Sequence, residues 1–239
     1  MNAPAPFCGP AFSPQGRWLQ VPATQVQEEF RLAFRRWGLP GTLRLDKGGP
    51  WGSDGDWPPA LALWLLGLGL DLHYNDPHTP RQNGVVERSQ GTSKRWGEPQ
   101  TCTRVEELQA RLQQTDHIQR EDYPSIAGHS RRAAYPGLAH SGRRYSRRWE
   151  EQHWDHQRVL EYLSGHVAVR RVDKNGKVSL YHHPHYVGIL HRGQEIYVQV
   201  DPQRGEWVFS DRQCQQLRSA PAEELQAARI RSLTVGNYS

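Results

Sequence analysis

The spacing of apolar residues changes near Gly165, and this change most constrains how the 239-residue chain can fold. Before this point, apolar residues recur at helical spacing or in short buried runs, as in alternating helices and strands. After it, apolar and polar residues alternate with a period of two, which is typical of strands with one buried face. The sequence therefore predicts an α/β region followed by a small all-β region.

The α/β region is predicted to cover residues 17–122. Its order of strand, helix, strand, helix, strand, helix is that of an α/β layer. We expect Thr24 to be the N-cap of the first helix, and the apolar run 61–70 to be core. The predicted strands are 17–23, 42–46 and 70–75, and the predicted helices are 25–37, 58–67, 83–96 and 105–120.

The all-β region is predicted to cover residues 163–218. It contains five short strands with turn signals between them, the clearest being the hairpin turn KNGK at 174–177. This density of short strands predicts a small β-barrel. The expected strands begin with the alternating pair Val167 and Val169 and continue with 178–182, 187–190, 196–200 and 207–210.

A basic linker is predicted between these regions, over residues 123–162. Its first part, 123–149, contains six arginines and no acidic residue: Arg131, Arg132, Arg143, Arg144, Arg147 and Arg148. These charges exceed the net charge of +5 of the whole chain, so the basic character is local. Such a segment favours contact with DNA phosphates, although it can also be a solvated linker. Its aromatic residues Tyr135, Tyr145 and Trp149 can stack on bases or anchor the linker.

The remaining composition excludes several classes of protein. Cys8, Cys102 and Cys214 are far apart, so neither a disulfide scaffold nor a cysteine zinc site is expected. The apolar stretch 60–70 is about half the length of a membrane helix. We therefore expect a soluble, cytoplasmic protein with no membrane partner. Residues 1–16 are predicted to be disordered, and 219–239 form a tail with a short helix.

Three residues carry the predicted chemistry. Asp46 closes the strand in LRLDKGGPW (43–51), and Glu87 lies in the first turns of the helix in PRQNGVVER (80–88). Lys94 follows Glu87 by two helical turns, so both lie on one helix face. Carboxylates brought together at a sheet edge can bind magnesium, and two such ions catalyse phosphoryl transfer by in-line displacement. We expect Asp46 and Glu87 to be metal ligands, and Arg88 and Lys94 to contact phosphates.

These motifs resemble the second and third carboxylate motifs of DDE transposases and retroviral integrases, especially bacterial insertion-sequence transposases. RWGLP at 36–40 and YPGL at 135–138 are also similar to that family, over roughly residues 17–218. The resemblance implies a partial ribonuclease-H-like core, with a mixed sheet and helices, followed by a small SH3-like β-barrel. It also implies Mg²⁺ or Mn²⁺, DNA and other transposase subunits as partners, and a possible homo-oligomer.

Two departures from the family pattern limit the expected activity. Lys47 stands where the family has Asn, and no Asp precedes Asp46 to supply the first catalytic carboxylate. We therefore expect a metal to bind weakly and the chain alone not to cleave DNA. A truncated transposase gene and a partner polypeptide that supplies the front half both remain open.

Other interpretations stand beside the transposase-like one. The alternative function is a non-catalytic DNA-binding or transposase-partner protein. In a third, weaker hypothesis, Asp46 and Glu87 form a general acid/base pair acting on a small substrate, which requires a closed pocket. The segment YHHPHY at 181–186 is expected to be a loop of ordinary histidines, and Asp54 and Asp56 are not assigned a metal role.

Overall fold

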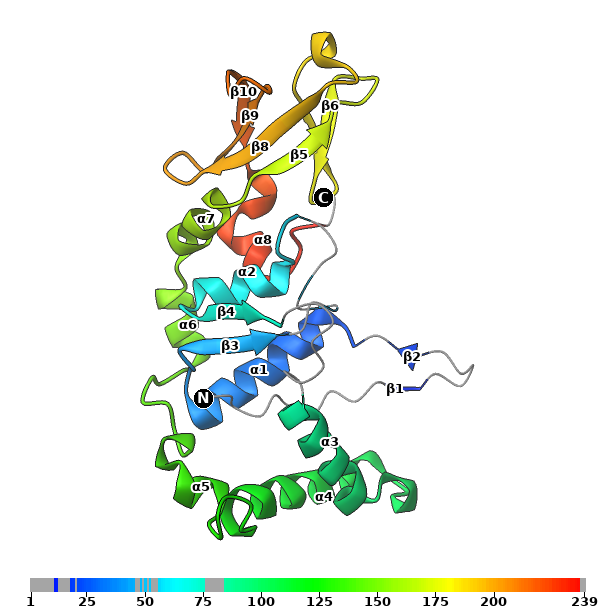
Figure 1. Ribbon diagram of the computed structural model, residues 1–239, viewed down its shortest axis with the longest axis vertical. Helices are drawn as coiled ribbons and strands as arrows, with labels where there is room; N and C mark the ends of the chain where they lie inside the picture. The colour runs from blue at the N-terminus through cyan, green and yellow to red at the C-terminus, as the bar shows by residue number, and fades with distance from the viewer. Residues whose placement is uncertain are drawn as a thin grey trace. The chain divides into compact units, whose positions relative to one another are not determined.

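The computed structural model describes residues 11–12, 18–19, 21–45, 48, 50, 52, 56–75 and 84–236. Figure 1 shows a mixed α/β protein with helices and small sheets, most of which are antiparallel. Of the predicted disordered segment 1–16, only Ala11–Phe12 is described, as strand β1, which pairs antiparallel with β2 (Trp18–Leu19). Asp46, Lys47 and Asp54 lie outside the described residues. None of the described helices is long and apolar enough to cross a membrane.

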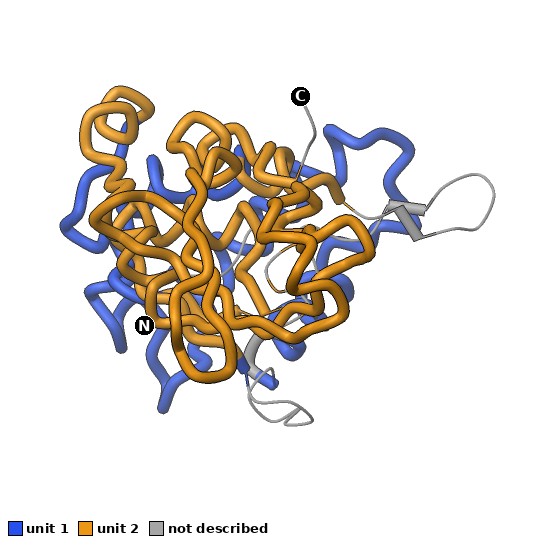
Figure 2. The backbone as a smooth tube through the Cα atoms, turned by 90° about the horizontal axis from the view of Figure 1, so that it is seen from above, with its two compact units in different colours: residues 1–20, 28–42, 75–146 blue, residues 21–27, 43–74, 147–239 orange. Residues whose placement is uncertain are grey.

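The chain divides into two compact units, coloured separately in Figure 2. Unit 1 contains residues 1–20, 28–42 and 75–146, and unit 2 contains residues 21–27, 43–74 and 147–239. Each unit thus combines three separate segments, whereas the sequence predicts consecutive domains.

Helix α1 (Ala23–Trp37) forms as its apolar spacing predicts. Val26, Phe30 and Phe34 are all buried at one face, which confirms the predicted amphipathic helix. The helix begins directly after Pro22, so Thr24 lies inside it and the prediction of an N-cap at Thr24 is wrong. Proline suits the start of a helix because the first amide groups have no partner there.

The rest of unit 1 is mainly helical. Gln119 joins α3 (Gly84–Gly97) to the segment after α4 (Val105–His117), because its amide bonds to the hydroxyls of Ser89 (3.5 Å) and Ser93 (3.3 Å). The chain after α4 continues as a π-helical turn, Ile118–Asp122. Short helical segments complete the unit: Pro99–Thr101, α5 (Arg131–Ala134) and Pro136–Leu138.

Unit 2 contains a strand–helix–strand segment whose helix is core. Strands β3 (Thr42–Leu45) and β4 (Asp71–Tyr74) pair with each other and run in the same direction in Figure 1. Between them in the chain, α2 (Ala60–Gly67) is buried from Leu61 to Gly67, which confirms the predicted apolar core. An all-round apolar helix is stable only when other elements cover it on every side.

Two helices follow where the sequence predicts part of the linker. They are α6 (Arg147–His153) and α7 (His156–Ser164), and the carboxylate of Asp155 caps α7 by accepting from the Arg158 amide at 3.0 Å. Val159, Leu160 and Leu163 of α7 are buried, so this helix contributes to the core of unit 2.

The C-terminal strands form two separate sheets. The first has the antiparallel order β10-β9-β8-β5, with β5 at Ala168–Arg171, β8 at Glu195–Asp201, β9 at Glu206–Ser210 and β10 at Gln216–Pro221. The second pairs β6 (Lys177–Leu180) with β7 (His183–Tyr186). No closed barrel is found among the described residues, so the SH3-like fold stays a prediction, as does the ribonuclease-H-like core.

The strand predicted at 187–190 is wrong. Gly188, with a φ of 145°, turns the chain into a 3-10 helix at Ile189–His191, and β7 lies just before it. A turn does form at 174–177, because the Asp173 carboxylate accepts from the amides of Asn175 and Lys177, both at 2.8 Å. The predicted hairpin is wrong, however, because the strand before this turn pairs with β8 and the strand after it pairs with β7. The C-terminal helix is also confirmed: a 3-10 turn at Glu223–Leu225 leads into α8 (Ala227–Arg231).

Candidate nucleic-acid interface

Of the two predicted metal ligands, the structure describes Glu87 but not Asp46. Strand β3 ends at Leu45, and Asp46 comes next, outside the described residues. Glu87 is exposed in the first turn of α3, where a carboxylate interacts favourably with the helix dipole. The distance between the two carboxylates therefore remains a prediction.

Helix α3 presents a charged face to solvent. Ser89 and Ser93 mark the side that bonds to Gln119. At 100° per residue, Glu87 and Lys94 lie on the opposite side, and both are exposed. This agrees with the prediction that they share one face. Arg88 is also exposed on this helix, and neither cation forms an ion pair with a described residue.

The described part of the chain does not make a metal site by itself. It contains no group of three His, Cys, Asp or Glu side chains placed to hold an ion. Glu87 offers a single exposed carboxylate, whereas Mg²⁺ in proteins is bound by one or two carboxylates together with substrate phosphates. A fit to Mg²⁺ or Mn²⁺ therefore depends on Asp46.

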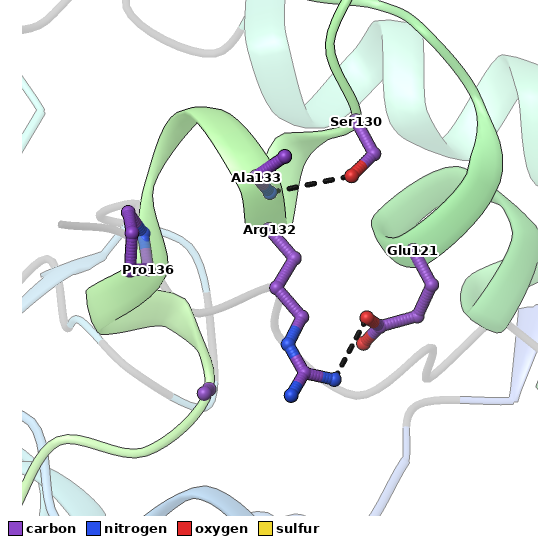
Figure 3. A pocket seen from close by; sticks show the side chains of 6 residues that line it. Glu121, Ser130, Arg132, Ala133 and Pro136 are labelled. Carbon is purple, nitrogen blue, oxygen red and sulfur yellow. Dashed lines mark hydrogen bonds and ion pairs between the residues drawn. The ribbon is translucent and has the colours of Figure 1, made fainter.

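The first arginine pair lies on α5, and Arg132 of this pair lines a pocket of about 420 Å³ in unit 1. Figure 3 shows Arg132 facing Glu121 across this pocket, with an ion pair of 2.9 Å. Ser130 caps the helix by accepting from the Ala133 amide at 3.2 Å. Ion pairs near the surface are weak, about 0–1 kcal/mol, so this contact holds Arg132 only loosely. Arg131 forms no ion pair with a described residue.

The second pair, Arg143 and Arg144, lies on a segment that is held firmly within unit 1. Leu39 donates its amide to the Arg143 carbonyl at 2.8 Å, and the Arg143 guanidinium donates to the Pro40 carbonyl, also at 2.8 Å. Tyr145 is buried with its ring edge-on to Phe34, 5.7 Å between centroids. Tyr145 is therefore an anchor and not a base-stacking residue. Arg144 is exposed and forms no ion pair with a described residue.

The third pair, Arg147 and Arg148, opens α6 in unit 2, and both side chains are exposed. The inward side of this helix is fixed by Glu150, which is 1% exposed and accepts from the Trp64 indole at 3.0 Å. Trp149 is half-buried and stacks on His153 of its own helix, 5.0 Å between centroids. At 100° per residue, Arg148 lies opposite Glu150 on the outer side of the helix, whereas Arg147 lies closer to the side of Glu150.

The histidine-rich segment is structural. It forms strand β7 and not the predicted loop: His185 bonds to the buried Glu224 carboxylate at 2.8 Å, and His183 to the Val235 carbonyl at 3.0 Å. Burial raises the pKa of Tyr181 far above its usual value, and its hydroxyl donates to the Pro58 carbonyl at 2.9 Å. These partners leave no open set of histidines for a metal.

A comparison with models of known protein families finds no match to this chain. Beyond the predicted residues, the structure adds an exposed Leu190 on a turn whose backbone bonds to the turn that carries Lys174 and Lys177, with Arg192 two residues after it. Sequence reasoning assigned this region to strands and a turn. The sequence signal that could have indicated this surface is the clustering of basic residues around two glycine-containing turns.

Proposed function

We propose that this chain binds duplex DNA as a DDE-transposase-like protein and does not cleave DNA by itself. The observation that carries the proposal is the accessibility of arginines in the segment 131–148, where Arg144 and Arg148 are exposed and Arg131 is half-buried. Among its arginines, Arg131, Arg144 and Arg148 form no ion pair with any described residue, so they keep their charge for an anionic partner. Arginine suits phosphate because its planar guanidinium donates two parallel hydrogen bonds.

The charged face of α3 supports the same partner. Lys94 and Arg88 are exposed on α3, and the opposite side of this helix is held by the hydrogen bond from Gln119 to Ser93. Cations on such helices contact phosphates and set the orientation of a protein on DNA without reading sequence. The binding we propose is therefore strongly dependent on salt and only weakly dependent on base sequence.

The absence of cleavage follows from the number of carboxylates. Two-metal phosphoryl transfer requires several carboxylates to hold both ions near 4 Å apart. Glu87 and Asp46 are the two acids that the family resemblance assigns to this role, and no Asp precedes Asp46 in the sequence. Another transposase subunit, or a second copy of this chain, is the partner with which such a protein would act.

The test is fluorescence anisotropy of a labelled duplex with the full chain and with R131Q/R144Q/R148Q. Three lost phosphate contacts lower the slope of log K against log salt by about 2.7, at about 0.9 per contact. The matched control is R104Q/R204Q/R212Q, which removes the same charge from exposed arginines elsewhere and should change the slope much less.

A nicking assay on supercoiled plasmid with Mg²⁺ or Mn²⁺ tests the second half of the proposal. We expect no metal-dependent nicking by the chain alone. Metal-dependent nicking that disappears in Glu87→Gln would contradict this and favour the second candidate, an active strand transferase. That candidate has one specific observation in its favour: the order β3, α2, β4, α3 places Glu87 on the helix after a strand–helix–strand segment.

A further inference from the structure

Two turns of unit 2, at residues 173–177 and 188–193, lie against each other; we call them the paired turns. The Gly176 carbonyl accepts from the amides of Val187 (2.8 Å) and Gly188 (3.1 Å). A Cβ atom on Gly176 would lie 2.7 Å from the Gly188 carbonyl carbon, so only glycine permits this approach. The contact fixes the position of one turn on the other.

The second of the paired turns carries two exposed apolar side chains, which we call the apolar point. Leu190 is 88% exposed, the most exposed large apolar side chain of the described residues, and its neighbour Ile189 is 58% exposed. Figure 1 shows this turn in gold, beyond the start of β6. Burial of one such side chain on binding contributes about 1.5–3 kcal/mol.

The backbone that carries Leu190 is held by hydrogen bonds on both sides. His191 donates to the Gly188 carbonyl and Arg192 to the Ile189 carbonyl, both at 3.2 Å, and the Ile189 amide donates to the Tyr186 hydroxyl at 3.3 Å. The apolar point is therefore preorganised, which reduces the entropic cost of inserting it into a partner.

The charges beside this point are positive. Lys174, Lys177 and Arg192 are exposed, and none forms an ion pair with a described residue. The acid of the paired turns, Asp173, directs its carboxylate to two amides of its own turn. An apolar tip between unpaired cations matches the minor groove of DNA, where apolar wedges enter a base step while cations contact the flanking phosphates.

We propose that Leu190 is a wedge that inserts into the minor groove and bends the duplex, with Lys174, Lys177 and Arg192 on the adjacent phosphates. This inference rests on the proposed DNA binding and adds a second contact in unit 2. A protein partner fits less well, because lysine is depleted from the buried core of protein interfaces. Wedges of this kind kink DNA by roughly 20–90°.

The test compares the full chain with Leu190→Ser on a duplex of about 30 base pairs carrying a donor and an acceptor dye at its ends. Wild-type binding should raise energy transfer, whereas L190S should bind about tenfold more weakly and leave energy transfer at the level of free DNA. Leu190 is exposed, so the substitution removes no core contact. Val105→Ser, at a residue 77% exposed on α4, is the matched control and should behave as wild type.

A second variant separates charge from insertion. K174Q/R192Q should lower the salt slope by about 1.8, at about 0.9 per phosphate contact, while some bending remains. No DNA binding by the wild type would overturn the proposed function and this inference together. If the wild type binds and the arginine-segment variant weakens it, but L190S bends DNA normally, the wedge alone is refuted. Loss of self-association in L190S with unchanged bending would also refute it, in favour of a protein-binding tip.

Discussion

The buried carboxylate of Glu224 gives a quantitative test of how unit 2 is held together. Glu224 is 2% exposed, and its Oε1 accepts from the Trp207 indole at 2.7 Å and from His185 Nε2 at 2.8 Å. Glu224→Ala removes the acceptor of both donors. Trp207 is fully buried and cannot turn to water, whereas the His185 side chain is 10% exposed and can do so in part.

The expected loss follows from these two exposures. A buried donor without a partner costs about 1–3 kcal/mol, so we assign the upper end to Trp207 and the lower end to His185. Glu224→Ala should therefore lower the free energy of unfolding by about 4 kcal/mol. Glu224→Gln keeps an acceptor oxygen and should lose about 1 kcal/mol.

Urea unfolding followed by tryptophan fluorescence measures this effect. At an m-value of about 2 kcal/mol per molar, Glu224→Ala should lower the midpoint by roughly 2 M. The neighbouring Glu223 is exposed, and Glu223→Ala should stay within about 0.5 kcal/mol of wild type. Equal midpoints for the two alanine variants would show that the Trp207–Glu224–His185 contacts do not stabilise the fold.

Two glycines and one tyrosine give further predictions. Gly67→Ala should destabilise the chain by roughly 1–3 kcal/mol in the same urea assay, because the new Cβ would overlap the Trp154 ring; unchanged stability would contradict this packing. Gly91→Ala should raise stability by about 1 kcal/mol, since its Cβ meets open space in the middle of α3; a loss would show a contact there. Burial, together with the nearby Tyr162, raises the pKa of Tyr74 to about 12, above its ordinary 10.0. Tyr74 in the folded chain therefore retains a proton that the unfolded chain loses, so its contribution to stability should be full below about pH 10 and be lost as the pH rises to about 12. Thermal melts across that range check this, and a flat profile would contradict it.

The sequence predicted best where one pattern determines both local structure and burial. The apolar run of α2 can be stable only when it is buried in the core. The spacing of Val26, Phe30 and Phe34 predicts a helix with one buried face, as the structure shows. On α3, the spacing of Glu87 and Lys94 placed both on the exposed face for the same reason.

The sequence predicted less well where pairing depends on distant segments. The turn at 174–177 forms, yet β5 pairs with β8 and not with β6, because which strands pair is decided by packing of the whole unit. Strand β7 forms where the histidines suggested a loop, and Gly188 interrupts the apolar residues 187–190 that suggested a strand. The sequence did not predict α6 and α7, because both are rich in arginine and histidine. The buried face of α7 consists of only Val159, Leu160 and Leu163, which is a weak apolar pattern.

The most direct measurement of the central claim is the dissociation constant of the wild-type chain for duplex DNA across a salt series without divalent metal. The account predicts a linear fall of log K with log salt, with a slope of about −3 or steeper, because at least three unpaired arginines meet phosphates. Little difference is expected between unrelated sequences of equal length. No binding at low salt, or an affinity that salt does not change, would contradict the account.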